Sequence, residues 1–391
     1  MTPITTTPDL ARFCAELRRH PFVAVDTEFM RESTYWPKLC LIQAAAGQAA
    51  AVIDPLSPEL DLAPFLEVMT DPSIEKVFHA ARQDVEILYN LGAMPIPLFD
   101  TQIAGMAAGF PEQVAYDALV RQMLGVDLDK SSRFTDWARR PLSEAQLTYA
   151  LADVTHLAEL YPMLRARLEE AGRLAWVREE MAALIDPALY DTEPENAWKR
   201  LKPRRHTAKY LAVLRGLAAW RERTAQNRDQ PRGRVMKDDA IDELATQAPL
   251  DLEAMGRLRS LPKGFPGSKF AAEVLETIRE AVAKAEHQPA EPKRAARPTS
   301  APTGAVVELL KVLLKARAED AQVASKLIAT VSDLEKIAAD DDADTPALQG
   351  WRREAFGEDA LKLKRGEIAL VLDGSRVRAV EVRRRQREPA A

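Results

Sequence analysis

Two carboxylates at the end of a short apolar run are the first residues of the chain that could do chemistry. Asp26 and Glu28 follow the β-favouring residues Val23-Ala24-Val25. Side chains at positions i and i+2 of a strand project from the same face, so both acids are expected to point together. Like charges at this spacing raise a pKa unless a cation lies between them, and hard divalent metals such as Mg²⁺ prefer oxygen ligands. A solvent-facing strand edge is the alternative for this pair.

Two further segments carry acids that fit the same kind of site. Asp84 follows the strand-like run 76–79 and stands at the start of an expected helix over 84–91. An acid in the first turn of a helix is also a favourable partner for the helix dipole and nothing more. Tyr149 and Asp153 lie four residues apart in a helical segment, so they share one face. The alternative for this pair is a partly buried tyrosine beside an exposed acid.

The order of these segments resembles the three motifs of the DEDD superfamily of 3′→5′ exonucleases. D-x-E, then Asp, then Y-x3-D is the pattern of its tyrosine-type branch, whereas the histidine-type branch would carry a histidine where Thr148 stands. The chain is also similar to the bacterial ribonuclease D family over essentially its whole length. That similarity is carried by four stretches, which are 25–29, 35–43, 77–84 and 130–137.

The resemblance implies a phosphodiester hydrolase that uses two divalent metal ions, Mg²⁺ or Mn²⁺, to activate water and to stabilise the leaving oxygen. It implies that Asp26 bridges both ions and that Glu28 and Asp153 complete the site on the nucleophile side. Asp84 would help hold the second ion, and Tyr149 would orient the attacking water. Because a free tyrosine has a pKa near 10, we expect the metal to carry most of the deprotonation.

Eight other residues are candidates for contacting the substrate: Thr27, Phe29, Gln43, His79, Gln83, Lys130, Arg133 and Trp198. Gln43 is expected to bond the terminal nucleotide, and the residues nearest to the acids are expected to pack or bond beside it. Lys130 and Arg133 lie in an expected loop and could hold phosphates. A structural role, or an ordinary surface charge for the two basic residues, is the alternative in each case.

The elements around these residues divide the chain. Four β-favouring runs alternate with helical patterns before residue 170, which indicates an α/β domain with a mixed sheet: 22–25, 39–44, 51–53 and 76–79. By resemblance this is a ribonuclease H-like nuclease domain, its sheet flanked by helices, followed by two all-α domains of the HRDC type. The expected segments are a nuclease domain over 1–170, a connecting segment over 171–205, a first HRDC domain over 206–286, a Pro-rich linker over 287–304 and a second, divergent HRDC-like domain over 305–391.

A faint repeat relates the two helical regions. The first begins with an expected long helix over 207–227, and a shift of 93 residues aligns its apolar positions with those of the second region. Val213, Leu214, Leu217 and Trp220 then fall on Val306, Val307, Leu310 and Leu313. Two related helical modules would explain the match. Identity between the regions is low, so chance alignment of two helical segments remains the alternative.

Charge is distributed unevenly along the 391 residues. The chain has 54 Lys and Arg against 59 Asp and Glu, a net charge of −5, which argues against a protein that binds nucleic acid by being basic throughout. The segment 198–237 nevertheless holds thirteen Lys or Arg against two acids, with Trp198, Tyr210 and Trp220 interleaved. Basic groups neutralise phosphates and exposed aromatic rings stack on bases, so we expect this segment to contact nucleic acid. A solvated helix face with core aromatics is the alternative.

Other features exclude several classes of protein. Cys14 and Cys40 form no zinc or disulfide pattern, the N-terminal residues do not resemble a signal peptide, and no apolar run approaches the length of a membrane span. We therefore expect a cytoplasmic protein with no membrane association and no obligatory protein partner. Its predicted function is to trim RNA with a free 3′ end, tRNA precursors in particular, and to release nucleoside 5′-monophosphates. The alternatives are an exonuclease acting on single-stranded DNA and a catalytically weak nucleic-acid-binding protein.

Overall fold

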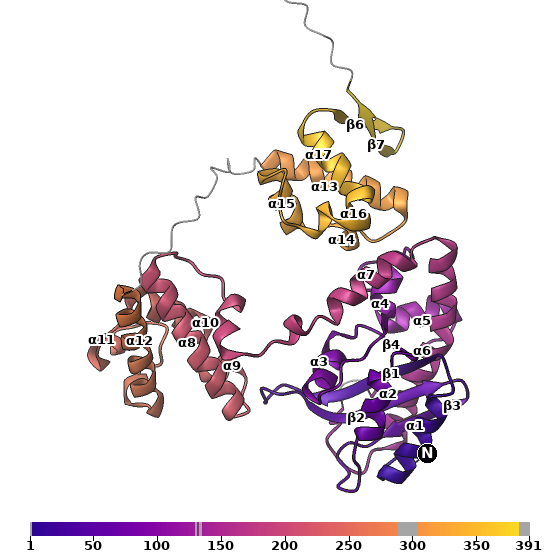
Figure 1. The fold of residues 1–391 in the computed structure, drawn as a ribbon, viewed down its shortest axis with the longest axis horizontal. Coiled ribbons are helices and arrows are strands. Elements are labelled where there is room, and N and C mark those ends of the chain that lie inside the picture. Colours follow the sequence, from indigo (N-terminus) through magenta and orange to yellow (C-terminus); the bar gives the residue numbers. More distant parts are fainter. Residues whose placement is uncertain (1, 130, 133–134, 288–303, 383–391) are drawn as a thin grey trace, which may run out of the picture.

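A mixed five-stranded sheet forms the centre of the N-terminal part in a computed structural model, which describes residues 2–129, 131–132, 135–287 and 304–382 (Figure 1). The strand order is β3-β2-β1-β4-β5. β1, β2 and β3 pair antiparallel, and β4 and β5 continue the sheet parallel to β1. The strands are β1 (Phe22–Met30), β2 (Lys38–Ala46), β3 (Ala49–Ile53), β4 (Glu75–Phe78) and β5 (Leu98–Asp100). The mixed sheet expected from the sequence is confirmed.

Six helices surround this sheet, and the last of them carries two of the predicted site residues. They are α1 (Thr7–Leu17), α2 (Ala63–Thr70), α3 (Arg82–Asn90), α4 (Thr101–Ala107), α5 (Tyr116–Leu124) and α6 (Glu144–Glu170). α6 begins at a capping box, in which the Ser143 hydroxyl and the Gln146 side chain satisfy each other's backbone N–H groups. Its buried residues recur at helical spacing and pack on β1, β2 and β3, which fixes the face that bears Tyr149 and Asp153.

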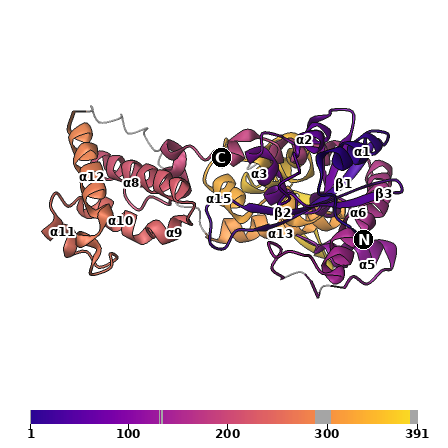
Figure 2. The same ribbon diagram turned by 90° about the horizontal axis from the view of Figure 1, so that it is seen from below.

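The first helical module, residues 208–287, lies to one side of the nuclease sheet in both views (Figures 1 and 2). It is reached through α7 (Leu174–Leu184), η1 (Pro187–Tyr190) and η2 (Pro194–Arg200), and it contains α8 (Ala208–Asn227), α9 (Arg232–Val235), α10 (Asp238–Gln247), α11 (Leu252–Gly256), η3 (Phe265–Gly267) and α12 (Lys269–His287). Its buried residues form a core separate from that of the sheet. Trp220 belongs to this core, as its place in the apolar stripe predicts.

The second helical module, residues 304–381, differs from the expectation at its end. It contains α13 (Gly304–Ala321), α14 (Ser325–Ile328), α15 (Val331–Ala339), η4 (Pro346–Leu348), α16 (Gly350–Arg352), the π-helical turn η5 (Arg353–Gly357), α17 (Glu358–Lys364) and a hairpin of β6 (Ile368–Asp373) and β7 (Arg376–Glu381). An all-helical segment up to residue 391 is therefore wrong. The physical reason is the two-residue turn Gly374-Ser375 between Asp373 and Arg376, where Gly374 adopts φ +62° as a tight hairpin turn requires.

The bounds of the helices agree with the 93-residue repeat. α9 and α14 are related by that shift at both ends, and α10 and α15 begin at equivalent positions. The relation stops where the hairpin takes the place of α12. The expected Pro-rich linker lies largely in residues 288–303, outside the described residues.

The second module shares its hydrophobic core with the nuclease domain. Leu310, Leu313 and Phe356 belong to the same cluster of buried residues as Val23 and Leu164. Figure 1 shows α14 and α16 near α4 and α7, and α4 contacts α14 directly. Among the described residues, no helix is both long enough and apolar enough to cross a membrane.

Candidate active site

β1 and α6 bring three of the predicted carboxylates together. Asp26 and Glu28 project from the same face of β1. Asp153 lies on α6, four residues or about one turn after Tyr149. One oxygen from each of Asp26, Glu28 and Asp153 lies within 4.8 Å of the others. All three side chains are partly exposed, so an ion could reach them from solvent.

The electrostatics of this cluster favour a bound cation. Burial raises the pKa of Asp26 from its ordinary value to about 6. A pKa in that range means that the carboxylate is costly to ionise where it stands, and a divalent cation between the oxygens would relieve the cost. The donor set consists of carboxylate oxygens, the ligands that Mg²⁺ and Mn²⁺ accept most readily, so these residues fit the metal that the sequence resemblance implies.

Asp84 lies beside this cluster but is not one of the three grouped oxygens. The hydroxyl of Thr27 donates a hydrogen bond to Asp84 Oδ1 at 2.5 Å, and the carboxylate is buried at the start of α3. Burial, and after it the charge of Asp26, raises the pKa of Asp84 well above its ordinary value. The structure thus places Asp84 within electrostatic reach of Asp26, with Thr27 as its polar partner.

Two tyrosines border the carboxylates. Tyr149 is hydrogen-bonded to Asp153, and its pKa is raised above the ordinary value by burial and then by the charges of Asp153 and Glu28. Its phenol is therefore protonated at neutral pH. Tyr116, at the start of α5, donates a hydrogen bond to the backbone carbonyl of Asp153. Tyr116 was missed from the sequence because nothing in its local pattern relates it to α6.

A cavity of about 530 Å³ opens over these residues. It is lined by two of the carboxylates, by Tyr149 and by residues of the neighbouring loops and helices: Asp26, His79, Ala80, Gln102, Gln113, Ala115, Tyr116, Asp117, Leu128, Asp129, Tyr149, Asp153 and Leu157. Asp26 and Asp153 of the cluster are therefore placed in the wall of a hollow rather than on a flat surface, as an enzyme that surrounds a nucleotide requires.

The turn that leads into α3 depends on a residue that the sequence did not single out. Ala80 has φ +58°, a conformation that residues with a side chain rarely adopt. The buried carboxylate of Asp100 accepts hydrogen bonds from the backbone N–H groups of Ala80 and Ala81 at 3.0 and 2.8 Å. The same carboxylate caps α4, so it fixes two elements at once. An Asp-Thr pair after a short apolar run is the helix-start signal that could have revealed it.

The predicted substrate contacts divide into several groups. His79 lines the cavity, but its two ring nitrogens bond Thr101 Oγ1 and the Val114 carbonyl, so it serves to hold the loop before α5. Gln43 is fully buried opposite Asp26 in the β1–β2 pair, and its amide has no hydrogen-bond partner among the described residues. Phe29 is partly buried and Gln83 is exposed.

The remaining candidates are two basic residues and a tryptophan. Lys130 and Arg133 lie outside the described residues. Trp198 is partly exposed in η2, and the guanidinium of Arg215 lies 4.5 Å from the centre of its ring. One face of the indole is therefore covered by Arg215.

Comparison with known proteins agrees with this geometry. Residues 1–169 match a family model described as a 3′-5′ exonuclease, and residues 210–278 match an HRDC domain. The chain is 50% identical to a ribonuclease D from Granulibacter bethesdensis and 51% identical to one from Nitrobacter hamburgensis, over 97% of this chain and 96% and 100% of the relatives.

A solved structure supports the same assignment. The crystal structure of Escherichia coli RNase D, described as an exoribonuclease involved in structured RNA processing, matches with a TM-score of 0.79 and 30% sequence identity. The match covers 93% of this chain and 99% of that one. The chain therefore belongs to the ribonuclease D family of 3′→5′ exoribonucleases.

Proposed function

We propose that this enzyme trims the 3′ ends of structured RNA, tRNA precursors in particular, and releases nucleoside 5′-monophosphates with the help of two divalent metal ions. The observation that carries the proposal is the grouping of Asp26, Glu28 and Asp153 within 4.8 Å beside a protonated Tyr149. The description of the E. coli relative, which concerns structured RNA, supports the substrate class.

The four carboxylates have separate tasks in this proposal. Bound Mg²⁺ or Mn²⁺ ions supply an activated water and neutralise the charge that develops on the leaving oxygen. Asp26, Glu28 and Asp153 would hold the ion on the side of the attacking water, with Asp26 shared between the two ions. Asp84 would contribute to the second position, and the Thr27 hydroxyl keeps its carboxylate turned toward Asp26.

Tyr149 acts by orientation in this proposal. Its raised pKa keeps the phenol protonated, so it is a poor base at neutral pH and a good hydrogen-bond donor. Trp137 is buried with its ring centre 6.1 Å from that of Tyr149, which limits the positions the phenol can take. Tyr149→Phe is expected to lower turnover while leaving RNA affinity unchanged, and an unchanged turnover would remove Tyr149 from the chemistry.

The first helical module would hold the RNA strand. Lys209, Arg215 and Arg234 are exposed on α8 and α9. Exposed cations on one element neutralise phosphates with release of counterions. The second module, whose first helices follow the 93-residue repeat, would be a divergent HRDC-like domain. We place the activity in the cytoplasm. Cys14 and Cys40 are buried thiols that form no disulfide, and such thiols stay reduced there.

The decisive assay uses 5′-labelled RNA and a single-stranded DNA of the same sequence, each with Mg²⁺, Mn²⁺ or EDTA. Stepwise shortening from the 3′ end is expected, and EDTA or Asp153→Asn should abolish it. Glu159→Gln is the matched control, because Glu159 lies on the same helix with an exposed side chain outside the cluster. Faster digestion of the DNA would contradict the substrate, and cleavage that survives EDTA would contradict the metal mechanism.

A further inference from the structure

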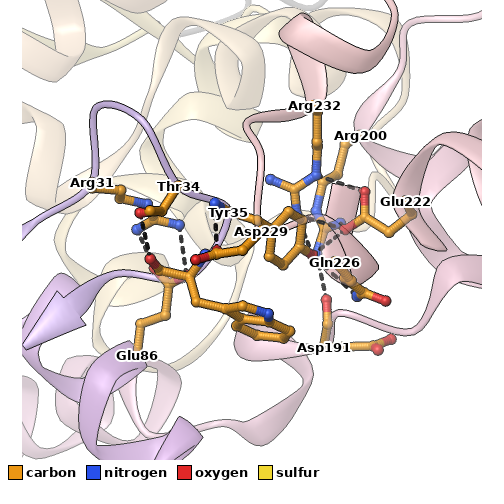
Figure 3. Close-up of polar contacts among 11 residues, drawn as sticks. Arg31, Thr34, Tyr35, Glu86, Asp191, Arg200, Glu222, Gln226, Asp229 and Arg232 are labelled. Carbon is orange, nitrogen blue, oxygen red and sulfur yellow. Dashed lines mark hydrogen bonds and ion pairs between the residues drawn. The ribbon is translucent and has the colours of Figure 1, made fainter. Parts of the chain in front are cut away.

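The loop between β1 and β2, residues 31–37, leaves the nuclease sheet and enters the first helical module (Figures 1 and 3). Tyr35 at its tip is 6% exposed. It belongs to the cluster of buried residues that forms the core of the first module, and not to the core of the sheet. A residue from one domain thus completes the core of another.

The Tyr35 hydroxyl is the centre of a polar network on that module (Figure 3). It donates to Glu222 Oε1 at 2.5 Å and accepts from Arg232 at 2.8 Å and from Gln226 at 3.2 Å. The guanidinium of Arg232 also lies 4.6 Å from the centre of the Tyr35 ring. One phenol therefore meets an anion, a cation and an amide of the neighbouring module.

Glu222 is a fully buried carboxylate whose charge depends on this network. Arg232 binds it through two hydrogen bonds of 2.6 Å, and Arg200 of the connecting segment lies 3.1 Å away. Burial would raise the pKa of Glu222, but the hydrogen bonds from Arg232 and Tyr35 outweigh it and hold the pKa below its ordinary value. Glu222 thereby joins three parts of the chain: the nuclease loop, the connecting segment and the first module.

A second contact fixes the backbone of the same loop. Asp229, just after α8, accepts hydrogen bonds from the backbone N–H groups of Tyr35 and Trp36 at 2.9 and 3.0 Å. Asp229 has φ +47°, a conformation that aspartate tolerates better than most residues. The loop is therefore held by its side chain and by its backbone.

The N-terminal end of the loop is bonded to α3, the helix that carries Asp84. Arg31 forms two hydrogen bonds of 2.7 Å with Glu86, which lies on α3 two residues after Asp84. Glu28 of the carboxylate cluster precedes Arg31 by three residues on the same strand and loop. The loop thus connects the strand and the helix that bear catalytic acids to the module that carries the exposed cations.

We propose that Tyr35, through Glu222 and together with Asp229, is a positioning residue for long RNA. It holds the first helical module at the orientation that leads an RNA strand from the module into the carboxylate cavity. The inference rests on the proposed role of that module in holding RNA. In this proposal a substrate of two nucleotides contacts the cavity and not the module, so its hydrolysis does not depend on Tyr35.

The test compares Tyr35→Phe with wild type on a 5′-labelled RNA of about thirty nucleotides and on a dinucleotide. Loss of hydrogen bonds to a charged group is expected to lower kcat/KM for the long RNA about tenfold, mainly through KM, and to leave the dinucleotide unchanged. Asp229→Gly should act in the same direction, because glycine accepts the positive φ without the carboxylate. Equal losses on both substrates, or no loss on the long RNA, would overturn the proposal.

Tyr210→Phe is the matched control. Tyr210 is a buried tyrosine of the same module, whose hydroxyl donates to Asp242 and accepts from the backbone N–H of Arg204, and not from the nuclease loop. Tyr210→Phe is expected to leave kcat/KM unchanged for both the long RNA and the dinucleotide. If Tyr210→Phe reproduced the loss on long RNA, the effect would come from the stability of the module and the positioning role would be refuted.

A distance measurement tests the positioning without any activity. Spin labels are attached at Glu67→Cys on the nuclease domain and Arg257→Cys on the first module, both exposed, while Cys14 and Cys40 are buried with raised pKa values and stay unlabelled. A narrow distance distribution is expected in the wild-type background and a broader one with Tyr35→Phe. An unchanged distribution would overturn the inference, whereas failure of the wild-type enzyme to digest RNA would instead refute the proposed function.

Discussion

The two helical modules are joined to the nuclease domain by different kinds of contact. The second shares its hydrophobic core with that domain, and Trp351 stacks on Trp176 with ring centres 4.3 Å apart and planes at 9°. The first has a core of its own, to which the nuclease domain contributes Tyr35, and it is bonded to the nuclease loop by the polar network of that residue. A continuous apolar core fixes one position by packing, whereas a polar joint of this kind depends on a few directional bonds.

Their charges differ as well. Residues 211–237 contain seven Lys or Arg against two acids, and the equivalent residues 304–330 contain four against three. Two segments related by the same shift therefore present different surfaces to a polyanion. The charge difference supports the proposed role of the first module in holding RNA, and the shared core makes the second module a support of the nuclease domain.

The largest effect should come from truncating the aromatic stack. Trp351→Ala leaves a cavity in the shared core, and we expect it to lower the free energy of unfolding of the nuclease domain and second module together by about 3–5 kcal/mol. Trp220→Ala is the matched change in the first module, since both tryptophans are 6% exposed. It should shift only the transition of that module in differential scanning calorimetry. Separate unfolding of the second module in Trp351→Ala would contradict the shared core.

A smaller effect should appear when the pH is lowered, with opposite signs at the two junctions. The pKa of Glu222 is depressed in the folded state, so its stabilisation is present above its ordinary pKa and is lost as the pH falls through the folded value. Glu180, paired with Arg352 at the second junction, has a pKa raised by burial. The contribution of Glu180 to the free energy of unfolding is complete below its ordinary pKa. That contribution is lost as the pH rises through the pKa of Glu180 in the folded state.

Thermal unfolding measured across the acidic pH range distinguishes the contributions of Glu222 and Glu180. Glu222→Gln should flatten the pH dependence of the first module's transition, and Glu180→Gln should leave that transition as it is in wild type. The same flattening in both variants would mean that the junctions do not titrate independently.

The smallest expected effect concerns the charge difference. Arg215→Ala should weaken RNA binding a few-fold and reduce the slope of log affinity against log salt by about 1, because one phosphate contact is lost. Lys315→Ala, an exposed cation on α13 of the second module, should change neither quantity. Fluorescence anisotropy in an Asp153→Asn background measures binding without hydrolysis. Equal slopes for the two variants would remove the division of roles.

Local patterns were sufficient for much of the fold and the site. The strand period placed Asp26 and Glu28 on one face, and the helix period placed Tyr149 and Asp153 on another, because both are properties of a few consecutive residues. The hairpin at 368–381 was within reach, since Gly374-Ser375 is a two-residue hairpin signal between two β-favouring runs. It was missed because helical patterns precede it.

Contacts between distant residues could not be predicted in this way. Tyr35 and Glu222 are separated by 187 positions, and each alone reads as an ordinary aromatic or acidic residue. The buried state of Gln43 depends on how α6 packs on β2. Such features follow from the assembled fold and not from spacing along the chain.

The shared core has a consequence for the order in which the protein can be made. Synthesis proceeds from the N-terminus, so the sheet and the first module are complete before the residues that cover α4 and α7 leave the ribosome. During that interval Trp176 and its apolar neighbours face water. A nascent chain of this enzyme therefore exposes an apolar surface until the second module is translated. A product that stops after the first module should be a substrate for chaperones or proteases.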